Sequence, residues 1–154
     1  MIDLIQIAAF NAAYAQLIDS DALEQWPDCF APDCRYRITN AENDAEGLQA
    51  GIVWVDSRDM LHDRVSALRE ANVYERQRYR HLLGLPLLEA ADATTANART
   101  PFMVARIMAT GETQLFATGV YRDRVVQQDG RLRLRSRVAV CDSTVTDTLL
   151  ALPL

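Results

Sequence analysis

The chain contains no lysine, so all of its basic side chains apart from histidine are arginines. No apolar run approaches the ~20 residues that a membrane helix needs, and no membrane association is expected. The formal net charge of −5 argues against nucleic acid as a partner, because nucleic acid selects basic surfaces. The N-terminus has neither a basic segment nor a small-residue cleavage site. We therefore expect no signal peptide and a cytoplasmic protein.

Residues that bind metals or act as nucleophiles are also scarce, with three cysteines and two histidines. Cys29 and Cys34 have C-x4-C spacing, but no second pair or nearby histidine completes a zinc site, so buried, reduced thiols are predicted. Neither histidine lies in a recognisable catalytic motif. We expect His62 to face water on a helix and His81 to be a hydrogen-bonded structural residue. An iron site with two histidines and one carboxylate would need both of them together, and nothing in the sequence supports that.

The composition, with 49% apolar and 24% charged residues in 154, is typical of one globular domain covering residues 1–154. A helix is expected after Asp3, and its few polar positions predict that it is largely buried. Asp21 and Glu24 have capping-box spacing and predict a short second helix that ends near Pro27. The third helix is expected after Asp56 or Ser57. The predicted helices cover about residues 4–18, 22–27 and 58–71.

The remaining segments alternate in polarity as strands do, with a polar loop at 40–51. The predicted strands cover about residues 34–39, 52–55, 79–88, 93–108, 113–127 and 131–141. Pro86 and Pro101 are expected at edges, bulges or breaks, while Gly111 and Asp129-Gly130 are expected in hairpin turns. Helices followed by a long run of strands predict an α+β domain. We expect a cone-shaped half-open barrel, with N-terminal helices packed into a strongly curved, mostly antiparallel sheet.

The hairpin around Asp129-Gly130 has two possible registers. A two-residue turn would place Arg135 opposite Arg124, and like charges directly opposed are unfavourable. We therefore predict a three-residue turn with Gly130 as a left-handed bulge, which sets Arg135 against Asp123. Strict alternation also predicts that one face of the last strand is shared by Arg131, Arg133, Arg135 and Arg137. We expect this face to meet acids, either local ones such as Asp123 or Glu112 or ones from a neighbouring subunit, and a solvated face is the alternative.

A cone of this kind can enclose a pocket for proton transfer between a buried acid and a tyrosine. Here Asp33 would be the base, Tyr14 and Tyr36 hydrogen-bond donors, and His81 a second base. The protein would then be a stand-alone dehydratase or isomerase using Asp33 and Tyr14. In the structural interpretation, both tyrosines pack in the core and Asp33 caps a turn.

Two groups of residues carry a resemblance to known proteins. The run Leu23-Glu24-Gln25-Trp26, with Phe30, Asp33 and Tyr36, resembles the opening of nuclear-transport-factor-2-like cone folds. The second group makes the resemblance more specific and consists of Met60-Leu61, Arg64, Leu68, Tyr74, Glu75, Arg80-His81 and the closing hairpin. Together these residues resemble the small, or beta, subunits of Rieske-type aromatic-ring-hydroxylating dioxygenases, over essentially the whole chain. The members that act on terephthalate are the most similar, through Ile5–Ala15, Arg78–Pro86 and Val140–Leu154.

The resemblance implies a non-catalytic structural subunit with no metal, cofactor or catalytic residue of its own. In this family the large alpha subunit holds a Rieske 2Fe–2S cluster and a mononuclear iron, and the beta subunits form the trimeric base of an α3β3 hexamer. Electrons from NADH arrive through a separate reductase, and the complex cis-dihydroxylates the ring of its substrate with O2. The substrate implied here is an aromatic carboxylate, with terephthalate favoured.

The C-terminal segment Thr148–Leu154 has four leucines in its last six residues. Burying each leucine gains roughly 1.5–3 kcal/mol, which favours a docked tail over a frayed one. Pro153 prevents a regular strand or helix from running to the end, so an extended segment is expected. The tail could fold into its own cone or cross into a neighbouring subunit. A trimeric base favours the second arrangement.

Overall fold

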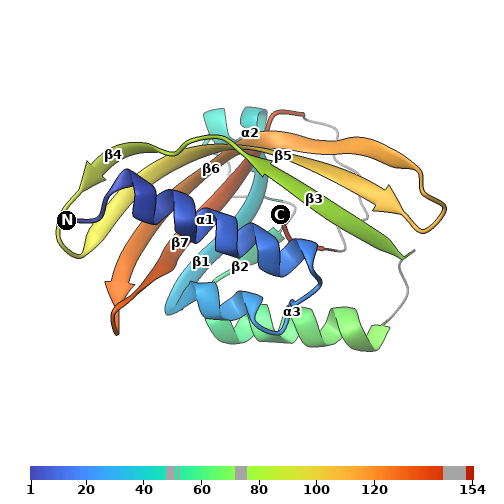
Figure 1. The fold of residues 1–154 in the computed structure, drawn as a ribbon, viewed down its shortest axis with the longest axis horizontal. Helices are drawn as coiled ribbons and strands as arrows, with labels where there is room; N and C mark the ends of the chain where they lie inside the picture. Colours follow the sequence, from blue (N-terminus) through green and yellow to red (C-terminus); the bar gives the residue numbers. More distant parts are fainter. Residues whose placement is uncertain (48–50, 52, 72–75, 144–151) are drawn as a thin grey trace.

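The computed structural model describes residues 1–47, 51, 53–71, 76–143 and 152–154. Within these ranges, three α-helices and a 3-10 helix pack with seven strands (Figure 1). The helices are α1 (Leu4–Asp19), η1 (Trp26–Cys29), α2 (Ala41–Ala45) and α3 (Arg58–Ala71). The strands are β1 (Phe30–Asn40), β2 (Val53–Val55), β3 (Gln77–Leu83), β4 (Leu87–Ala91), β5 (Thr95–Met108), β6 (Thr113–Gln128) and β7 (Arg131–Cys141).

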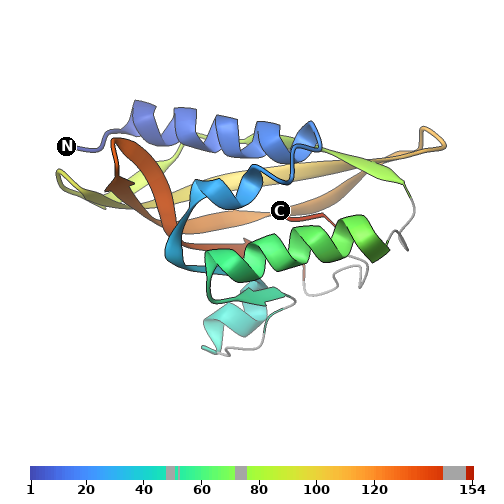
Figure 2. The same ribbon diagram turned by 90° about the horizontal axis from the view of Figure 1, so that it is seen from below.

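All seven strands form one curved sheet in the order β2-β1-β7-β6-β5-β3, with β4 also pairing with β5. The pairing of β1 with β7 is parallel, and every other pairing is antiparallel. The helices α1 and α3 lie within the arch of the sheet, on its concave side (Figures 1 and 2). The α+β cone predicted from the sequence is therefore confirmed.

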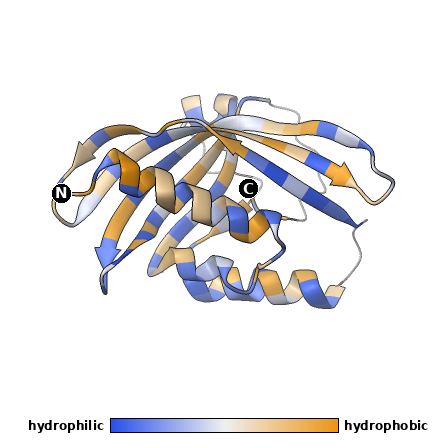
Figure 3. Ribbon diagram, in the orientation of Figure 1, coloured by the Kyte–Doolittle hydropathy of each residue, from blue (hydrophilic) through white to orange (hydrophobic). Residues whose placement is uncertain are grey.

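The first helix begins where the sequence places it. The Asp3 carboxylate accepts a hydrogen bond from the Gln6 amide (2.8 Å), and the Gln6 side chain accepts one from the Asp3 amide (2.9 Å). The hydropathy colouring of Figure 3 shows apolar residues along most of α1. Ile7, Tyr14 and Ile18 are buried, yet Ile5 is 78% exposed. The expectation that this helix is largely buried is wrong, because the described part of the chain packs against one side of it, where the buried residues lie.

The predicted second helix is replaced by turns and the short helix η1, in which Pro27 occupies the first turn. Asp21 adopts a left-handed backbone (φ 61°), which ends the preceding helix rather than opening a new one. The carboxylates expected to cap that helix instead bind Arg69 of α3, at 3.0 Å from Asp21 and 2.7 Å from Glu24. A contact distant in sequence therefore overrides the local capping pattern.

Capping and proline effects elsewhere follow the predictions. Ser57 precedes α3, and its hydroxyl accepts a hydrogen bond from the Met60 amide (3.2 Å). The predicted loop after β1 contains the short helix α2. Pro101 lies in β5 between the residues that pair with β3 and those that pair with β4, where its missing N–H disrupts no ladder. Its carbonyl accepts a hydrogen bond from the Gly84 amide (2.9 Å) at this break.

The β6–β7 hairpin differs from the predicted one. Asp129 and Gly130 form a two-residue turn, with φ of 52° and 73°, and Gln128 pairs with Arg131. Both positive φ values are those of a type I′ turn, so the three-residue turn is wrong. Opposition of Arg135 and Arg124 is avoided by a bulge farther along β7, since Val125 pairs with Leu134 but Arg124 pairs with Ser136.

This bulge at Arg135 reverses the alternation of side chains along β7. Arg137 consequently turns into the cone, where it is fully buried, and pairs with Asp123 of β6. The shared face predicted for the four arginines is therefore wrong. Asp123 was correctly anticipated as a local acid for the arginine strand, but its partner is Arg137 rather than Arg135, which binds Asp33 (3.0 Å).

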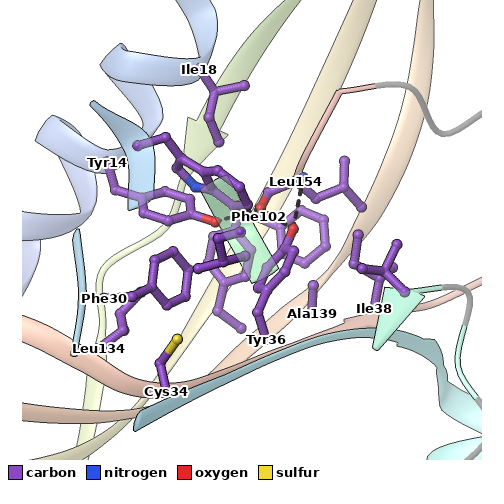
Figure 4. Close-up of a cluster of buried hydrophobic side chains, with 14 of the residues drawn as sticks. Tyr14, Ile18, Phe30, Cys34, Tyr36, Ile38, Phe102, Leu134, Ala139 and Leu154 are labelled. Atoms are coloured by element: carbon purple, nitrogen blue, oxygen red, sulfur yellow. Dashed lines mark hydrogen bonds between the residues drawn. The ribbon is translucent and has the colours of Figure 1, made fainter. Parts of the chain in front are cut away.

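Aromatic side chains from α1, η1 and the sheet fill the cone. Trp26 contacts the rings of Phe30 and Tyr36 edge-on, with centroid distances of 5.5 and 5.3 Å. Leu152 and Leu154 both belong to this buried core, and Figure 4 shows Leu154 among its side chains. The tail therefore docks as predicted, but in its own chain, and the favoured exchange into a neighbour is wrong for these residues. Positions 148–151 lie outside the described residues.

Candidate functional site

The interior of the cone brings two of the predicted candidates together. The hydroxyls of Tyr14 from α1 and Tyr36 from β1 both donate to the main-chain oxygen of Leu154, at 2.7 and 2.9 Å (Figure 4). The Tyr36 hydroxyl also accepts a hydrogen bond from the Leu154 amide (3.0 Å). The chain's own C-terminal segment thus occupies the position where a substrate would meet these hydroxyls.

Both tyrosines are held in the neutral form. Burial raises the pKa of Tyr14 to about 12, although the nearby Arg137 guanidinium lowers it. Burial likewise raises the pKa of Tyr36 well above its ordinary value. A neutral phenol can donate a hydrogen bond, but neither residue is poised to release a proton near neutral pH.

The predicted base, Asp33, does not join the tyrosines. It lies on the outward side of β1, its side chain is 65% exposed, and its carboxylate pairs with Arg135. The turn-capping role of Asp33 is also not observed, since it lies within β1. Tyr14 is fully buried in the core. The acid–tyrosine pair needed by the dehydratase hypothesis is therefore not assembled.

His81 forms a buried pair with an acid from α1. Its Nδ1 lies 2.6 Å from Asp19 Oδ1, and its amide donates to Asp19 Oδ2 (2.8 Å). The two side chains are 0% and 5% exposed. The expected hydrogen-bonded structural histidine is confirmed, and the Asp19 carboxylate satisfies an amide that β3 leaves unpaired at the sheet edge. His62 lies exposed on α3, as expected.

A buried polar network was missed by the sequence reasoning. Arg137 donates to both oxygens of Asp123, at 2.8 and 2.7 Å, and to the Asn11 side-chain oxygen at 2.6 Å. The guanidinium carbon lies 4.2 and 4.0 Å from the ring centroids of Tyr14 and Tyr121. Burial alone would lower the pKa of Arg137, but the Asp123 carboxylate raises it overall.

One half of this network has a sequence signal. Asp123 shares its strand face with Tyr121 and Val125, both fully buried, so an acid at this position needs an internal partner. The partner could not be identified in the same way, because Arg137 reaches the interior only through the bulge at Arg135. The network joins α1, β6 and β7 but is enclosed by the aromatic core, and we interpret it as structural.

The thiols are free, with Cys34 and Cys141 buried and Cys29 half-buried. Burial raises the pKa of each thiol to about 11, which disfavours the nucleophilic thiolate. Among the described residues, no group of three or more histidine, cysteine or acidic side chains could hold a metal ion. None of the helices described is long and apolar enough to cross a membrane.

The donor set also does not fit a Rieske cluster, which needs two cysteines and two histidines at defined spacings. His81 Nδ1 is already bound to Asp19, and His62 lies exposed on a different element.

The chain is similar to known proteins in sequence and in fold. The model of the SnoaL-like domain matches residues 2–138. The chain is 69% identical, over all 154 residues of both, to the terephthalate 1,2-dioxygenase terminal oxygenase component subunit beta 1 of Comamonas sp. It is 37% identical to the anthranilate 1,2-dioxygenase small subunit of Burkholderia cepacia, over 97% of this chain and 92% of that one.

A crystal structure from Novosphingobium aromaticivorans has the same fold. It is a beta subunit assigned to an aromatic-ring-hydroxylating dioxygenase and superposes with a TM-score of 0.90. The identity is 38%, covering 98% of this chain and 96% of that one.

Proposed function

Because the chain belongs to the SnoaL-like domain family and, within it, to the beta subunits of ring-hydroxylating dioxygenases, we propose that it is a non-catalytic subunit of an aromatic-carboxylate dioxygenase. The proposed substrate of the complex is terephthalate, the compound named for a relative 69% identical to this chain. The chain supports the assembly of the iron-bearing subunits and performs no chemical step itself.

The contact of Leu154 with Tyr14 and Tyr36 carries the non-catalytic part of this proposal. A cone that acts as an enzyme needs open space beside its hydrogen-bond donors, and here the chain's own main chain occupies that space. The Asp33 carboxylate, which would act as the base, is on the outer surface and paired with Arg135.

The complex that we propose contains three copies of this chain as a base beneath three iron-bearing alpha subunits, in the cytoplasm. The alpha subunit would supply the Rieske cluster and the mononuclear iron, and a separate reductase would deliver electrons from NADH. In the overall reaction, both atoms of O2 add to adjacent ring carbons, and NADH and a proton supply two electrons and two protons. The products are a cis-dihydrodiol and NAD⁺.

Co-expression with the gene of a large, iron-bearing subunit tests this proposal. We expect light scattering to give the mass of a hexamer with equal numbers of the two chains. Together with the reductase, the hexamer should consume terephthalate and NADH in equal amounts. The isolated chain should neither turn over terephthalate nor catalyse dehydration or isomerisation. Such activity in the isolated chain would contradict a non-catalytic role.

A further inference from the structure

In the part of the chain that the structure describes, the convex face of the sheet has no helical layer of the kind that covers the concave face. Both α1 and α3 lie inside the arch (Figures 1 and 2), and among the described helices only α2 contacts a margin of the convex side. Outward-facing side chains of β1, β5, β6 and β7 form this surface. A sheet face without a covering layer is normally polar, and this one is polar only in part.

A hollow of about 400 Å³ opens on the convex face where β1, β7 and β6 adjoin. Arginines from two strands form its walls together with an aromatic residue, a threonine and a valine, and Asp44, Gly47 and Gly51 complete the lining. The residues on the strands are Arg35, Arg37, Arg122, Trp54, Thr39 and Val138.

The charges around the hollow are incompletely balanced. The Arg122 guanidinium makes two hydrogen bonds to Asp44, at 2.9 and 2.8 Å. Arg37 stacks on the Trp54 ring, 3.4 Å from its centroid, with Asp56 at 3.5 Å. In the described part of the chain, no carboxylate lies within 4.0 Å of Arg35. Three guanidinium groups therefore face two carboxylates, and the hollow retains positive charge.

Two buried polar atoms at this hollow have no partner among the described residues. Thr39 is 8% exposed, and its Oγ1 makes no hydrogen bond. The buried Nε atom of Arg37 also makes no hydrogen bond. Buried donors of this kind are normally satisfied. Both can donate to oxygen, and arginine pairs with carboxylates in a planar, two-bonded geometry. The unsatisfied donors and the positive charge therefore point to the same ligand chemistry, a carboxylate.

The surface beside the hollow is apolar and suits a protein better than a free anion. Pro101, Val120 and Val140 occupy consecutive cross-strand positions of β5, β6 and β7, and Val140 adjoins Thr39 of β1. The neighbouring pair Leu82 and Met103 is 63% and 43% exposed. Contiguous apolar surface of this kind marks interaction sites.

We propose that this hollow receives an aspartate or glutamate side chain from the iron-bearing subunit, while apolar surface of that subunit covers the adjacent row. The inference rests on the proposed function and extends it by assigning the contact surface. The Thr39 hydroxyl and the Arg37 and Arg35 guanidinium groups bind the incoming carboxylate, and the β5–β7 row excludes water around it.

The test compares Arg35→Glu and Thr39→Val with Arg78→Glu, a matched charge reversal on the exposed side of β3. Each chain is combined with the iron-bearing subunit, and the dissociation constant is measured by sedimentation velocity at two salt concentrations. Arg35→Glu should weaken association about tenfold or more, because it opposes the partner carboxylate. Thr39→Val should weaken it about threefold or more without altering the melting temperature of the isolated chain. Arg78→Glu should remain within about twofold of the unaltered chain.

Equal association of all three variants would overturn this inference and leave the proposed function intact. If the unaltered chain failed to assemble, both would be overturned. Calorimetric titration of the isolated chain with terephthalate provides a further test. Terephthalate binding that Arg35→Glu abolishes, with assembly unchanged, would make the hollow a small-anion site and overturn the partner assignment.

Discussion

Arg137 and Asp123 form a two-bonded ion pair in which neither side chain is exposed. Removing one member of such a pair leaves an uncompensated buried charge, which costs about 3–5 kcal/mol. We therefore expect Arg137→Met and Asp123→Asn each to lower the free energy of unfolding by about that amount in urea titrations. Replacing both residues by leucine should restore part of the loss. The exposed pair Arg135–Asp33 provides the control, since its disruption should cost about 0–1 kcal/mol.

The docked C-terminus makes a second prediction. Leu154 is fully buried, and Leu154→Ala should cost about 2–5 kcal/mol by removing core contacts. Tyr36→Phe should cost about 1–3 kcal/mol, because it leaves the Leu154 amide unpaired, while the Leu154 oxygen keeps its hydrogen bond from Tyr14. Leu85→Ala, at a side chain 78% exposed, should change stability by less than about 0.5 kcal/mol. Thermal unfolding of the isolated chain measures all three. A chain lacking residues 152–154 that kept its melting temperature would contradict the observed docking.

The type I′ turn at Asp129-Gly130 makes a third prediction. Gly130→Ala should destabilise the chain by about 1–2 kcal/mol, because a side chain disfavours the left-handed backbone seen at φ 73°. Asp129→Asn should be neutral or slightly stabilising, since asparagine suits the same turn. Chemical denaturation compares the two variants. Tolerance of Gly130→Ala would indicate a different turn in solution.

The turn between β4 and β5 should make the stability of the chain depend on pH in the acid range. The Asp92 carboxylate accepts hydrogen bonds from the amides of Thr94 and Thr95, both at 2.8 Å, which lower the pKa of Asp92 to about 2. In the unfolded chain the pKa should be about 3.9. The contribution of Asp92 is therefore fully present above pH ~4 and is lost as the pH falls from about 4 to about 2. NMR titration of the carboxyl carbon checks the value, and Asp92→Asn should remove this part of the acid dependence.

We predict that the thiols of the folded chain react slowly. With the pKa of each raised to about 11 by burial, the folded chain should react with a disulfide reagent at pH 8 much more slowly than the unfolded chain. All three thiols should react after denaturation. Rapid labelling of one thiol in the folded chain would contradict this, and Cys29, the half-buried one, is the first to examine.

Features set by neighbouring residues could be predicted from the sequence. The Asp3 cap, the Ser57 cap and the break at Pro101 each depend on residues close in the chain. The strand boundaries of β7 were also correct, at 131 and 141. Features set by distant partners could not be predicted. Arg69 takes the carboxylates of the expected second helix, and the bulge at Arg135 has no signal of its own.

In the candidate site, too, some features could be predicted from the sequence and those set by distant partners could not. Packing of Tyr14 and Tyr36 in the core is one of two interpretations that the sequence allows, and the structure confirms it. Their shared partner, the main chain of Leu154, could not be foreseen because it lies more than ~100 residues away in sequence, and such contacts depend on topology. Asp33 differs again, since strand polarity alone does not say whether an acid faces into or out of a curved sheet.

The parallel pairing of β1 with β7 has a consequence for how the chain is made. β1 meets its central neighbour, from Phe30 opposite Leu134 to Asn40 opposite Cys141, across roughly 100 residues of sequence. During translation, β1 can pair only with β2 until the last strand has left the ribosome. At roughly 5–20 residues per second, the growing chain spends several seconds with this edge of β1 unpaired. Chaperone binding to the nascent chain should therefore be strongest after β1 emerges and should end only after β7 does.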